Sequence, residues 1–349
     1  MTEYEKICSF QNLYKAHIKC RRNKRHKPEV IRFEMNLAEN LTSMSEALKS
    51  RTYRMQGYYH FTIYEPKKRE VFAAHYADRV LLHCICDEVL ASSIGPRLIY
   101  DNAACQVGKG THFALDRMSD FLRRHYRQHG NNGYVLKCDI SKYFSNIDHE
   151  ILKEQLTKAI RDRDVLRLLY HFIDSYHTPD QIGTGIPLGN QSSQWFGLYY
   201  LDPLDRLIKE KFQVKSYVRY MDDFLLVHPD KQFLRECLNT IRGFVKEALN
   251  LELNEKTQLY TLKDGFEFLG WKFILTDTGK VVRRLKKQSK QRFKRRLKQI
   301  QQEYATGTMT LEEVKAVLAS YNGHLSHGHT YQMQKKVYHD FLLKKNGNR

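Results

Sequence analysis

The decisive stretch of this sequence reads Ser216-Tyr217-Val218-Arg219-Tyr220-Met221-Asp222-Asp223-Phe224-Leu225-Leu226-Val227-His228. Strand-forming residues precede and follow Met221-Asp222-Asp223, so the pattern predicts strands over 216–220 and 224–228 joined as a hairpin. Adjacent acids repel one another at such a tip, and Asp is also a common turn residue. The hairpin therefore indicates either ordinary turn chemistry or a binding site for divalent cations.

Another strand that ends in an acid is predicted upstream. Tyr134 to Ile140 is rich in strand formers, follows a turn at 130–133 and carries Asp139 near its end. Mg²⁺ binds carboxylate oxygens together with substrate phosphates, and two such ions roughly 4 Å apart can activate an attacking hydroxyl and stabilise a leaving pyrophosphate. Asp139, Asp222 and Asp223 are therefore the candidate catalytic residues, with two Mg²⁺ ions as cofactors and Mn²⁺ able to replace them.

The segments around these strands predict helices. Apolar residues recur at helical spacing over 37–48, 78–90 and 233–249. Asp148 can cap a helix that begins at His149, and 251–253 restarts a strand. The order strand, helix, hairpin, helix, strand is typical of an α+β layer, so we expect an antiparallel sheet with helices on one face.

The chain is strongly basic, and its positive charge is concentrated in two blocks. Lys and Arg total 58 against 39 Asp and Glu, which gives a formal charge of +19 over 349 residues. Lys15 to Lys27 holds seven basic residues and Lys280 to Gln299 holds eleven, and neither block contains an acid. In the second block, apolar positions at helical spacing are Phe293, Leu297, Ile300 and Tyr304. The cationic face of such a helix suits a phosphate backbone, and the alternative is a lysine-rich helix that only aids solubility.

Composition argues against several classes of protein. The sequence has no uninterrupted run of about 18 apolar residues, and its N-terminus is charged where a secretory signal peptide needs an apolar run. Seven cysteines, an odd number in a long chain, favour a reducing compartment over a disulfide framework. We therefore expect a cytoplasmic protein with no membrane segment.

Short motifs, in order along the chain, resemble the boxes of reverse transcriptases. Tyr220-Met221-Asp222-Asp223 resembles their signature box, and Asp139-Ile140-Ser141-Lys142-Tyr143-Phe144 resembles their other metal-binding box. Between the two lies Gly185-Ile186-Pro187-Leu188-Gly189. Two later motifs of the family, a lysine motif and the hairpin that grips the primer, are resembled by Lys256-Thr257 and Phe268-Leu269-Gly270-Trp271. The resemblance implies a right-hand polymerase fold. Its parts would be an N-terminal extension and fingers over 1–130, an antiparallel-sheet palm over 131–275 with a fingers-derived segment around 160–190, and a helical basic thumb over 276–349.

The resemblance also implies roles for individual residues. The metal ligands would be Asp139, Asp222, Asp223 and the carbonyl of Ile140. Phe144 would be a steric gate under the sugar that favours deoxynucleotides, unless it is simply a core phenylalanine. The nucleotide would further contact the fingertip cations Lys67 and Arg69, with Lys68 beside them, and Leu188, Gly189, Gln194 and Lys256. The primer and template would contact Phe268, Leu269, Gly270 and Trp271 and the thumb arginines Arg292, Arg295 and Arg296.

One departure from the common pattern narrows the resemblance. Most reverse transcriptases have Gln-Gly followed by Ser-Pro in the middle box, whereas this chain has Leu188-Gly189 followed by Ser193-Gln194. That pattern is similar to the reverse transcriptases of diversity-generating retroelements. The resemblance implies an enzyme that copies a template-repeat RNA, misincorporates mainly opposite template adenine, and works with a small basic accessory variability protein.

Leu188 is the candidate residue for low fidelity, because an aliphatic side chain cannot hydrogen-bond the nucleotide as a glutamine can, and discrimination by apolar contact is typically about 1–3 kcal/mol. Arg69 is a second candidate, and an ordinary buried leucine is the alternative for Leu188. Other readings of the chain are a retron, group II intron-like or anti-phage defence enzyme. A basic nucleic-acid-binding scaffold without catalysis is the reading from a different class.

Overall fold

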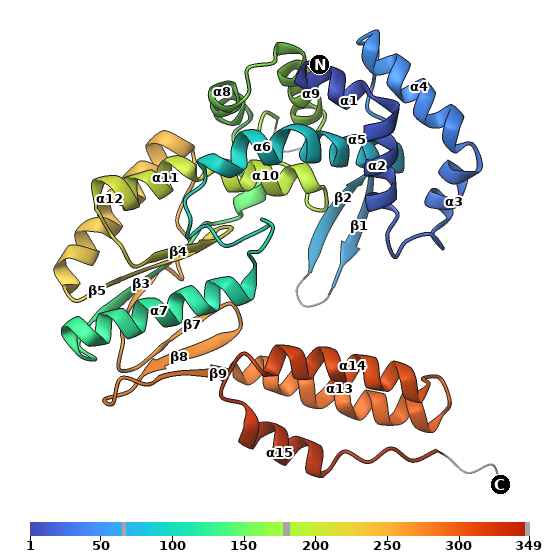
Figure 1. Cartoon of the computed structure of the whole chain (residues 1–349). Helices are drawn as coiled ribbons and strands as arrows, with labels where there is room; N and C mark the ends of the chain where they lie inside the picture. The colour runs from blue at the N-terminus through green and yellow to red at the C-terminus, as the bar shows by residue number, and fades with distance from the viewer. Residues whose placement is uncertain (65–67, 177–181, 346–349) are drawn as a thin grey trace.

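The computed structural model describes residues 1–64, 68–176 and 182–345. Its N-terminal part is a cluster of helices, drawn in dark blue in Figure 1. These helices are α1 (Glu3–Cys8), α2 (Phe10–Cys20), α3 (Pro28–Met35) and α4 (Leu37–Lys49). Thr2 begins α1 with a capping box, and α4 confirms the helix predicted over 37–48. The basic block 15–27 therefore covers the end of α2 and the turns that follow it.

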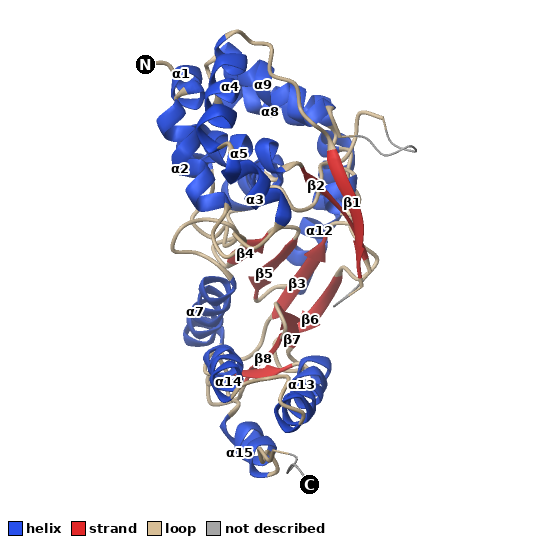
Figure 2. Cartoon of the chain, turned by 90° about the vertical axis from the view of Figure 1, so that its right-hand side faces the viewer, coloured by secondary structure: helices blue, strands red, loops and turns tan. Residues whose placement is uncertain are grey.

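A two-stranded hairpin projects from these helices (Figures 1 and 2). Its strands are β1 (Tyr58–Ile63) and β2 (Arg69–Ala74), paired antiparallel. The next helix confirms the one predicted over 78–90, in the consecutive pieces α5 (Tyr76–Ile85), η1 (Cys86–Leu90), α6 (Ala91–Ile94) and η2 (Gly95–Arg97). Further helices in this upper half are α8 (His149–Ala159), α9 (Arg163–Asp174) and α10 (Gln191–Tyr200). Asp148 caps α8 as predicted, because its carboxylate accepts hydrogen bonds from two backbone N–H groups of the first turn.

The central sheet has the strand order β4-β5-β3-β6, and the neighbouring pairs are antiparallel. Its strands are β3 (Tyr134–Asp139), β4 (Tyr217–Tyr220), β5 (Asp223–His228) and β6 (Gln258–Thr261). The hairpin predicted around Met221 is confirmed, with Asp223 already the first residue of β5. The prediction of a strand over 251–253 is wrong. The described chain there has only an isolated antiparallel bridge between Leu253 and Ile140, made by two backbone hydrogen bonds, from Ser141 to Glu252 and from Asn254 to Asp139.

Helices cover both faces of this sheet, so the expectation of helices on one face is wrong. α12 (Lys231–Leu249) packs against one face, where Leu136 and Ile241 share a core. α7 (Thr111–His129) packs against the other, where Val135 and Phe121 share a second core. The reason is in the strands, since consecutive residues such as Leu225 and Leu226 are both apolar and fully buried. The segment α11 (Asp202–Arg206) and η4 (Leu207–Lys211) lies beside α12.

The C-terminal part begins with a small antiparallel sheet and ends in helices. The strands are β7 (Phe266–Phe268), β8 (Trp271–Leu275) and β9 (Val281–Leu285), and the helices are α13 (Lys287–Ala305), α14 (Leu311–Leu325) and α15 (Tyr331–His339). Phe293, Leu297 and Ile300 are buried in a core of their own, which confirms the amphipathic helix predicted there. Gly328 lies against Trp271, since a Cβ atom at Gly328 would fall 1.9 Å from the indole ring. The loop after α14 is thereby packed onto β8.

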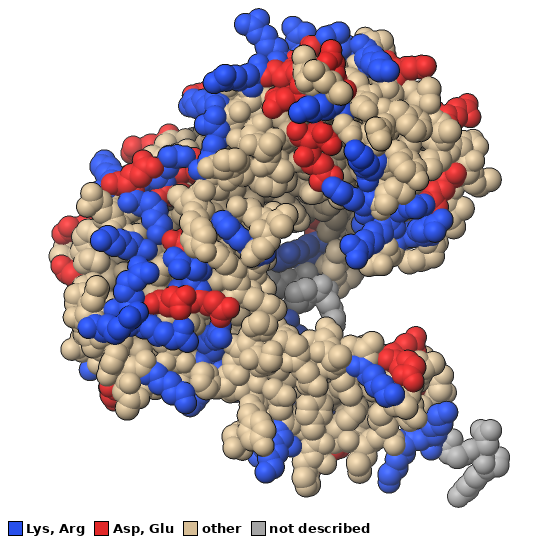
Figure 3. All heavy atoms as spheres, viewed as in Figure 1, with Lys and Arg blue, Asp and Glu red and all other residues tan. Residues whose placement is uncertain are grey.

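The space-filling view shows a hollow between the upper helices and the C-terminal helices (Figure 3). The upper helices and the β1–β2 hairpin border it above, the central sheet lies at its closed side, and α13 and α14 border it below. Within the described residues, no helix is both long enough and apolar enough to cross a membrane.

Candidate active site

The central sheet brings the three predicted carboxylates to one end. Asp139 is the last residue of β3 and is paired directly with Asp223, the first residue of β5. Asp223 is also paired with Tyr220 of β4, so Met221 and Asp222 form the two-residue turn between these strands. Asp139 and Asp222 are 83 positions apart in sequence, and the sheet brings them to the same end of its strands.

The turn has an unusual backbone. Met221 has φ of +56°, in the left-handed region that a residue with a side chain seldom occupies. Its carbonyl oxygen accepts a hydrogen bond of 3.0 Å from Nη1 of Arg219. A strained conformation persists only where its surroundings hold it, and Arg219 provides one such contact.

Arg219 is a residue that sequence reasoning missed. Its side chain is fully buried and makes a bidentate pair with buried Asp205, at 2.7 Å from Nε to Oδ1 and 2.5 Å from Nη2 to Oδ2. Nη2 also donates to the carbonyl of Leu198, and the hydroxyl of Tyr217 donates to Asp205 at 2.6 Å. The available signal was an arginine inside an apolar strand, which must have a partner when buried.

The carboxylates at the strand ends are electrostatically strained. Burial, and then the charge of Asp139, raises the pKa of Asp222 from 3.8 to about 6. Burial likewise raises the pKa of Asp223 to about 6, although the ammonium of Lys137, 3.5 Å from Oδ2, opposes the shift. Oδ1 of Asp223 is buried and has no hydrogen-bond partner among the described residues. A cation at this position would relieve both the repulsion and the unmet acceptor.

These observations fit Mg²⁺. The donors are hard carboxylate oxygens, and one of them is a buried acceptor without a partner. Among the described residues, no group of three or more His, Cys, Asp or Glu side chains lies close enough together to hold a metal ion by itself. Mg²⁺ does not require one, because it commonly binds through one or two carboxylates and completes its shell with water and substrate phosphates.

The residues predicted to contact a nucleotide lie at different depths. Phe144 is half-buried, and its ring lies 3.4 Å from the position of a Cβ atom on Gly197 of α10. Leu188 is half-buried, and a Cβ atom on the next residue, Gly189, would lie 3.5 Å from Val71 of β2. The exposed side chains of this group are Gln194 and Lys256.

The structure describes two of the three predicted fingertip cations, Lys68 and Arg69. Lys67 lies outside the described residues, and Lys68 is exposed. Arg69, the first residue of β2, is exposed, and its positive charge opposes the rise in the pKa of Asp222. The structure therefore brings Arg69 within electrostatic reach of Asp222.

The predicted primer-contacting hairpin is present between β7 and β8. Phe268 and Trp271 are fully buried in the core under α7, whereas Leu269 and Gly270 form the turn between the strands. Leu269 and Gly270 are half-buried, so the turn, and not the two aromatic side chains, leaves surface for the predicted primer contact.

The thumb arginines differ in their surroundings. On α13, Arg292 and Arg295 are exposed, whereas Arg296 is half-buried and paired with Glu303 at 3.3 Å. The unneutralised charge of this group therefore belongs to Arg292 and Arg295.

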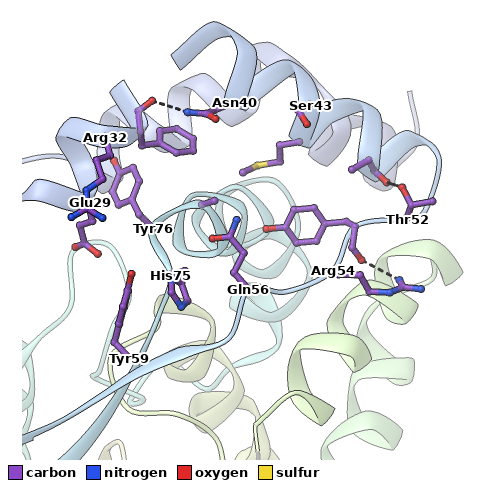
Figure 4. Close-up of a pocket in the computed structure, with 15 residues that line it drawn as sticks. Glu29, Arg32, Asn40, Ser43, Thr52, Arg54, Gln56, Tyr59, His75 and Tyr76 are labelled. Carbon is purple, nitrogen blue, oxygen red and sulfur yellow. Dashed lines mark hydrogen bonds between the residues drawn. The ribbon is translucent and has the colours of Figure 1, made fainter. Parts of the chain in front are cut away.

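A pocket of ≈ 440 Å³ lies apart from these residues, between α3, α4 and the start of α5 (Figure 4). Its polar walls include Arg32, Asn40, Gln56, Tyr59 and His75. It contains none of the predicted catalytic or nucleotide-binding residues, so it is separate from the candidate active site.

Comparison with known sequences points to one family. A family model described as reverse transcriptase (RNA-dependent DNA polymerase) matches residues 86–273. Protein YkfC of Escherichia coli is 27% identical over 178 residues, which cover 40% of this chain and 47% of that protein. The putative COX1/OXI3 intron 2 protein of Saccharomyces cerevisiae is 22% identical over 241 residues, covering 51% of this chain and 28% of that protein. The group II intron-encoded protein LtrA of Lactococcus lactis is 27% identical over 140 residues, covering 37% and 23%. The chain thus spans less than half the length of these relatives.

Comparison with solved structures bears on the fold. Telomerase from Candida albicans, in complex with a TWJ fragment of telomeric RNA, has a TM-score of 0.51 at 14% identity, covering 86% of this chain and 58% of that one. Apo telomerase from Candida tropicalis, truncated from its C-terminal domain, has a TM-score of 0.50 at 12% identity, covering 71% and 60%. Together with the family model, these similarities confirm the predicted right-hand polymerase fold.

Proposed function

Because the matching family model spans more than half of its residues, the chain belongs to the reverse transcriptase family, and we propose that it is an RNA-directed DNA polymerase. The observation that carries the proposal is the direct pairing of Asp139 with Asp223, beside Asp222 at the hairpin turn. The substrates would be an RNA template, a DNA or RNA primer and deoxynucleoside triphosphates. The description of the matching family model, RNA-dependent DNA polymerase, supports the copying of RNA.

The proposed chemistry is nucleotidyl transfer. When bound, Mg²⁺ would supply the Lewis acidity that activates the primer hydroxyl and stabilises the leaving pyrophosphate. Asp139, Asp222, Asp223 and the carbonyl of Ile140 would hold it. Arg69 would contact the triphosphate, since a guanidinium matches the geometry of phosphate oxygens. Phe144 would lie under the sugar and exclude a 2′-hydroxyl.

A finer proposal is that the enzyme belongs to a diversity-generating retroelement. It would copy a template-repeat RNA with errors opposite template adenine, for mutagenic retrohoming. The support is the pattern Leu188-Gly189 followed by Ser193-Gln194. Leu188 is half-buried on the loop before α10 and precedes Gly189, which approaches β2. An aliphatic residue there offers no hydrogen bond that depends on correct base-pair geometry.

The same proposal includes a partner and a location. The partner would be a small, basic, oligomeric accessory variability protein, and the location would be the cytoplasm. The seven cysteines are free thiols, which is compatible with a reducing compartment.

The test of the coarse proposal is primer extension. The purified chain with Mg²⁺ should extend a DNA primer annealed to RNA, and Mn²⁺ should replace Mg²⁺. A chain that binds the hybrid tightly but adds no nucleotide with either ion would instead be the non-catalytic scaffold.

The test of the finer proposal is the error spectrum. Sequencing of cDNA copied from an RNA that contains all four bases should show errors concentrated opposite adenine. The reaction should be run with and without the accessory protein. Errors spread evenly over the four template bases would contradict the retroelement assignment and would favour the retron, intron-like or defence enzymes.

A further inference from the structure

The end of the central sheet opposite to the carboxylates holds a cationic cavity. β3 and β5 run from Asp139 and Asp223 at one end to Tyr134 and His228 at the other. With about 3.3 Å per strand residue, the two ends of β5 are about 17 Å apart. A cavity of ≈ 550 Å³ lies at the His228 end, between the last turns of α7, the loop after η4 and the start of α12.

The charge of this cavity is of one sign. The cavity is lined by two cationic side chains, Arg124 and Lys215, and by three histidines, His125, His129 and His228. None of its described lining residues is Asp or Glu. Arg124 and Lys215 are exposed, and neither makes an ion pair within the described part of the chain. In Figure 3, many lysine and arginine side chains lie over α7 and α11 at the left of the view, with several Asp and Glu side chains among them. A cavity with this lining favours an anion.

His125 is the most buried of the three histidines, with only 5% of its surface exposed. Burial lowers the pKa of His125. Its hydrogen bond to the carbonyl of Asn132 opposes this shift, and the nearby His129 and His228 add to it. Nδ1 of His228 accepts a hydrogen bond of 3.1 Å from the N–H of Asp230, so Nε2 is the ring nitrogen that is left to donate.

The cavity also has aromatic and polar walls. The rings of His228 and Phe233 lie with centroids 4.2 Å apart. Ser216 and Gln128 add a hydroxyl and an amide. A volume of this size is within the range of about 300–1,000 Å³ that is typical of ligand pockets. Cations for a phosphate, a ring surface for a base and polar groups for a 2′-hydroxyl are the combination that recognises unstacked RNA nucleotides.

We propose that this cavity binds a nucleotide of single-stranded RNA outside the polymerase channel. It lies at the far end of the sheet from the catalytic carboxylates, and none of the predicted catalytic, nucleotide-binding or primer-binding residues lines it. RNA could therefore be held there while a primer and template occupy the hollow beside the thumb. This site is independent of the proposed polymerase activity.

The test is binding of a fluorescein-labelled 12-nucleotide uridine RNA to the full chain, followed by fluorescence anisotropy. The chain is first saturated with a blunt RNA–DNA hybrid so that the channel is occupied. Wild-type protein should still bind the probe, and Arg124→Ala combined with Lys215→Ala should weaken binding at least tenfold. The slope of log affinity against log salt should fall by about 1.4, since each phosphate contact on a single strand contributes about 0.7.

The matched control is Arg123→Ala. Arg123 is exposed on the same helix, next to Arg124, but it is paired with Asp120 at 2.9 Å and does not line the cavity. This variant should keep probe affinity within twofold, and melting temperatures should show that all variants fold. The double variant should also extend a short primed template within twofold of the wild-type rate.

Three results would overturn the proposal. They are loss of probe binding when the hybrid occupies the channel, an equal loss of affinity in Arg123→Ala, and binding of a 12-nucleotide thymidine DNA as tight as that of the RNA. Crosslinking of a 5-iodouridine probe gives an independent readout, because the crosslinked peptide should contain His228 and Phe233 and not the turn at Asp222.

Discussion

The two ends of strands β3 and β5 carry opposite charge. At one end Asp139 is paired with Asp223, beside Asp222, and the pKa values of Asp222 and Asp223 are raised. At the other end His228 borders a cavity lined by Arg124 and Lys215 and by no described acid. The same pairing register fixes both ends, so one rigid sheet separates a site that favours cations from a site that favours anions. Each end indicates the charge of its ligand by the sign of the side chains that gather there.

The ends also differ in how their residues are held. The turn at the acidic end is tied to a buried ion pair through Arg219, whereas Arg124 and Lys215 at the basic end are exposed. The acidic end is thus part of the folded core, and substitution of a residue that supports it, such as Arg219, should lower stability. Substitutions at the basic end should cost binding alone.

The largest effect is expected from Arg219→Met. It leaves Asp205 charged and buried without its partner, which should lower the free energy of unfolding by about 3–5 kcal/mol. The same change frees the carbonyl of Met221 and should slow extension. Urea denaturation monitored by circular dichroism measures the loss. Arg242→Met is the control, because Arg242 is exposed on α12 and should change stability by less than about 0.5 kcal/mol. A loss below about 1 kcal/mol for Arg219→Met would show that the ion pair does not hold the acidic end.

A smaller effect is expected from the raised pKa values at the acidic end. Between pH 4 and 6 the folded protein keeps protons on Asp222 and Asp223 that the unfolded chain has lost, so stability of the metal-free protein should fall as pH rises through this window. At pH 7.5 in EDTA, Asp222→Asn should therefore be more stable than wild type by about 1–2 kcal/mol, and at pH 4 the two should be equal.

Thermal unfolding at the two pH values measures this difference. Addition of Mg²⁺ should stabilise the wild type more than the variant, since a bound cation offsets the repulsion. Destabilisation by Asp222→Asn at pH 7.5 without metal would mean that the carboxylates are not strained against one another.

The smallest effect concerns fidelity beside the acidic end. Leu188→Gln should lower the frequency of errors opposite adenine several-fold, because an amide can add a hydrogen bond worth about 1 kcal/mol in the correct geometry. Leu188→Met is the matched control, since it conserves volume and adds no polar group. Sequencing of cDNA from the three proteins decides the role, and an unchanged adenine bias in Leu188→Gln would exclude it.

Local patterns in the sequence predicted most of what surrounds the catalytic end. The strand at 134–139, the hairpin around Met221 and the cap at Asp148 depend on neighbouring residues, and the structure confirms them. The family motifs added the right-hand fold. The roles of Phe144, Gln194, Lys256 and the thumb arginines remain predictions, because they depend on substrates.

Features that depend on distant partners could not be predicted. Arg219 is close to the turn in sequence, but its partner Asp205 is on another element, and no spacing rule connects them. The packing of α7 on the second face of the sheet and the cationic cavity at its end both arise when separate segments meet. The burial of Phe268 and Trp271 could not be predicted either, because an aromatic side chain suits both a core and a primer contact.

The central claim is that the acidic end of the sheet performs nucleotidyl transfer. The most direct test is the single-turnover rate at which one deoxynucleotide is added to a DNA primer on RNA, measured for wild type and for Asp222→Asn, which keeps the shape of the side chain and removes its charge. We expect Asp222→Asn to lower this rate about 10³-fold or more, equivalent to about 4 kcal/mol of transition-state stabilisation. The variant should still bind the hybrid, and Arg124→Ala combined with Lys215→Ala at the opposite end should react at nearly the wild-type rate. A wild-type rate for Asp222→Asn would show that the charge of Asp222 takes no part in nucleotidyl transfer.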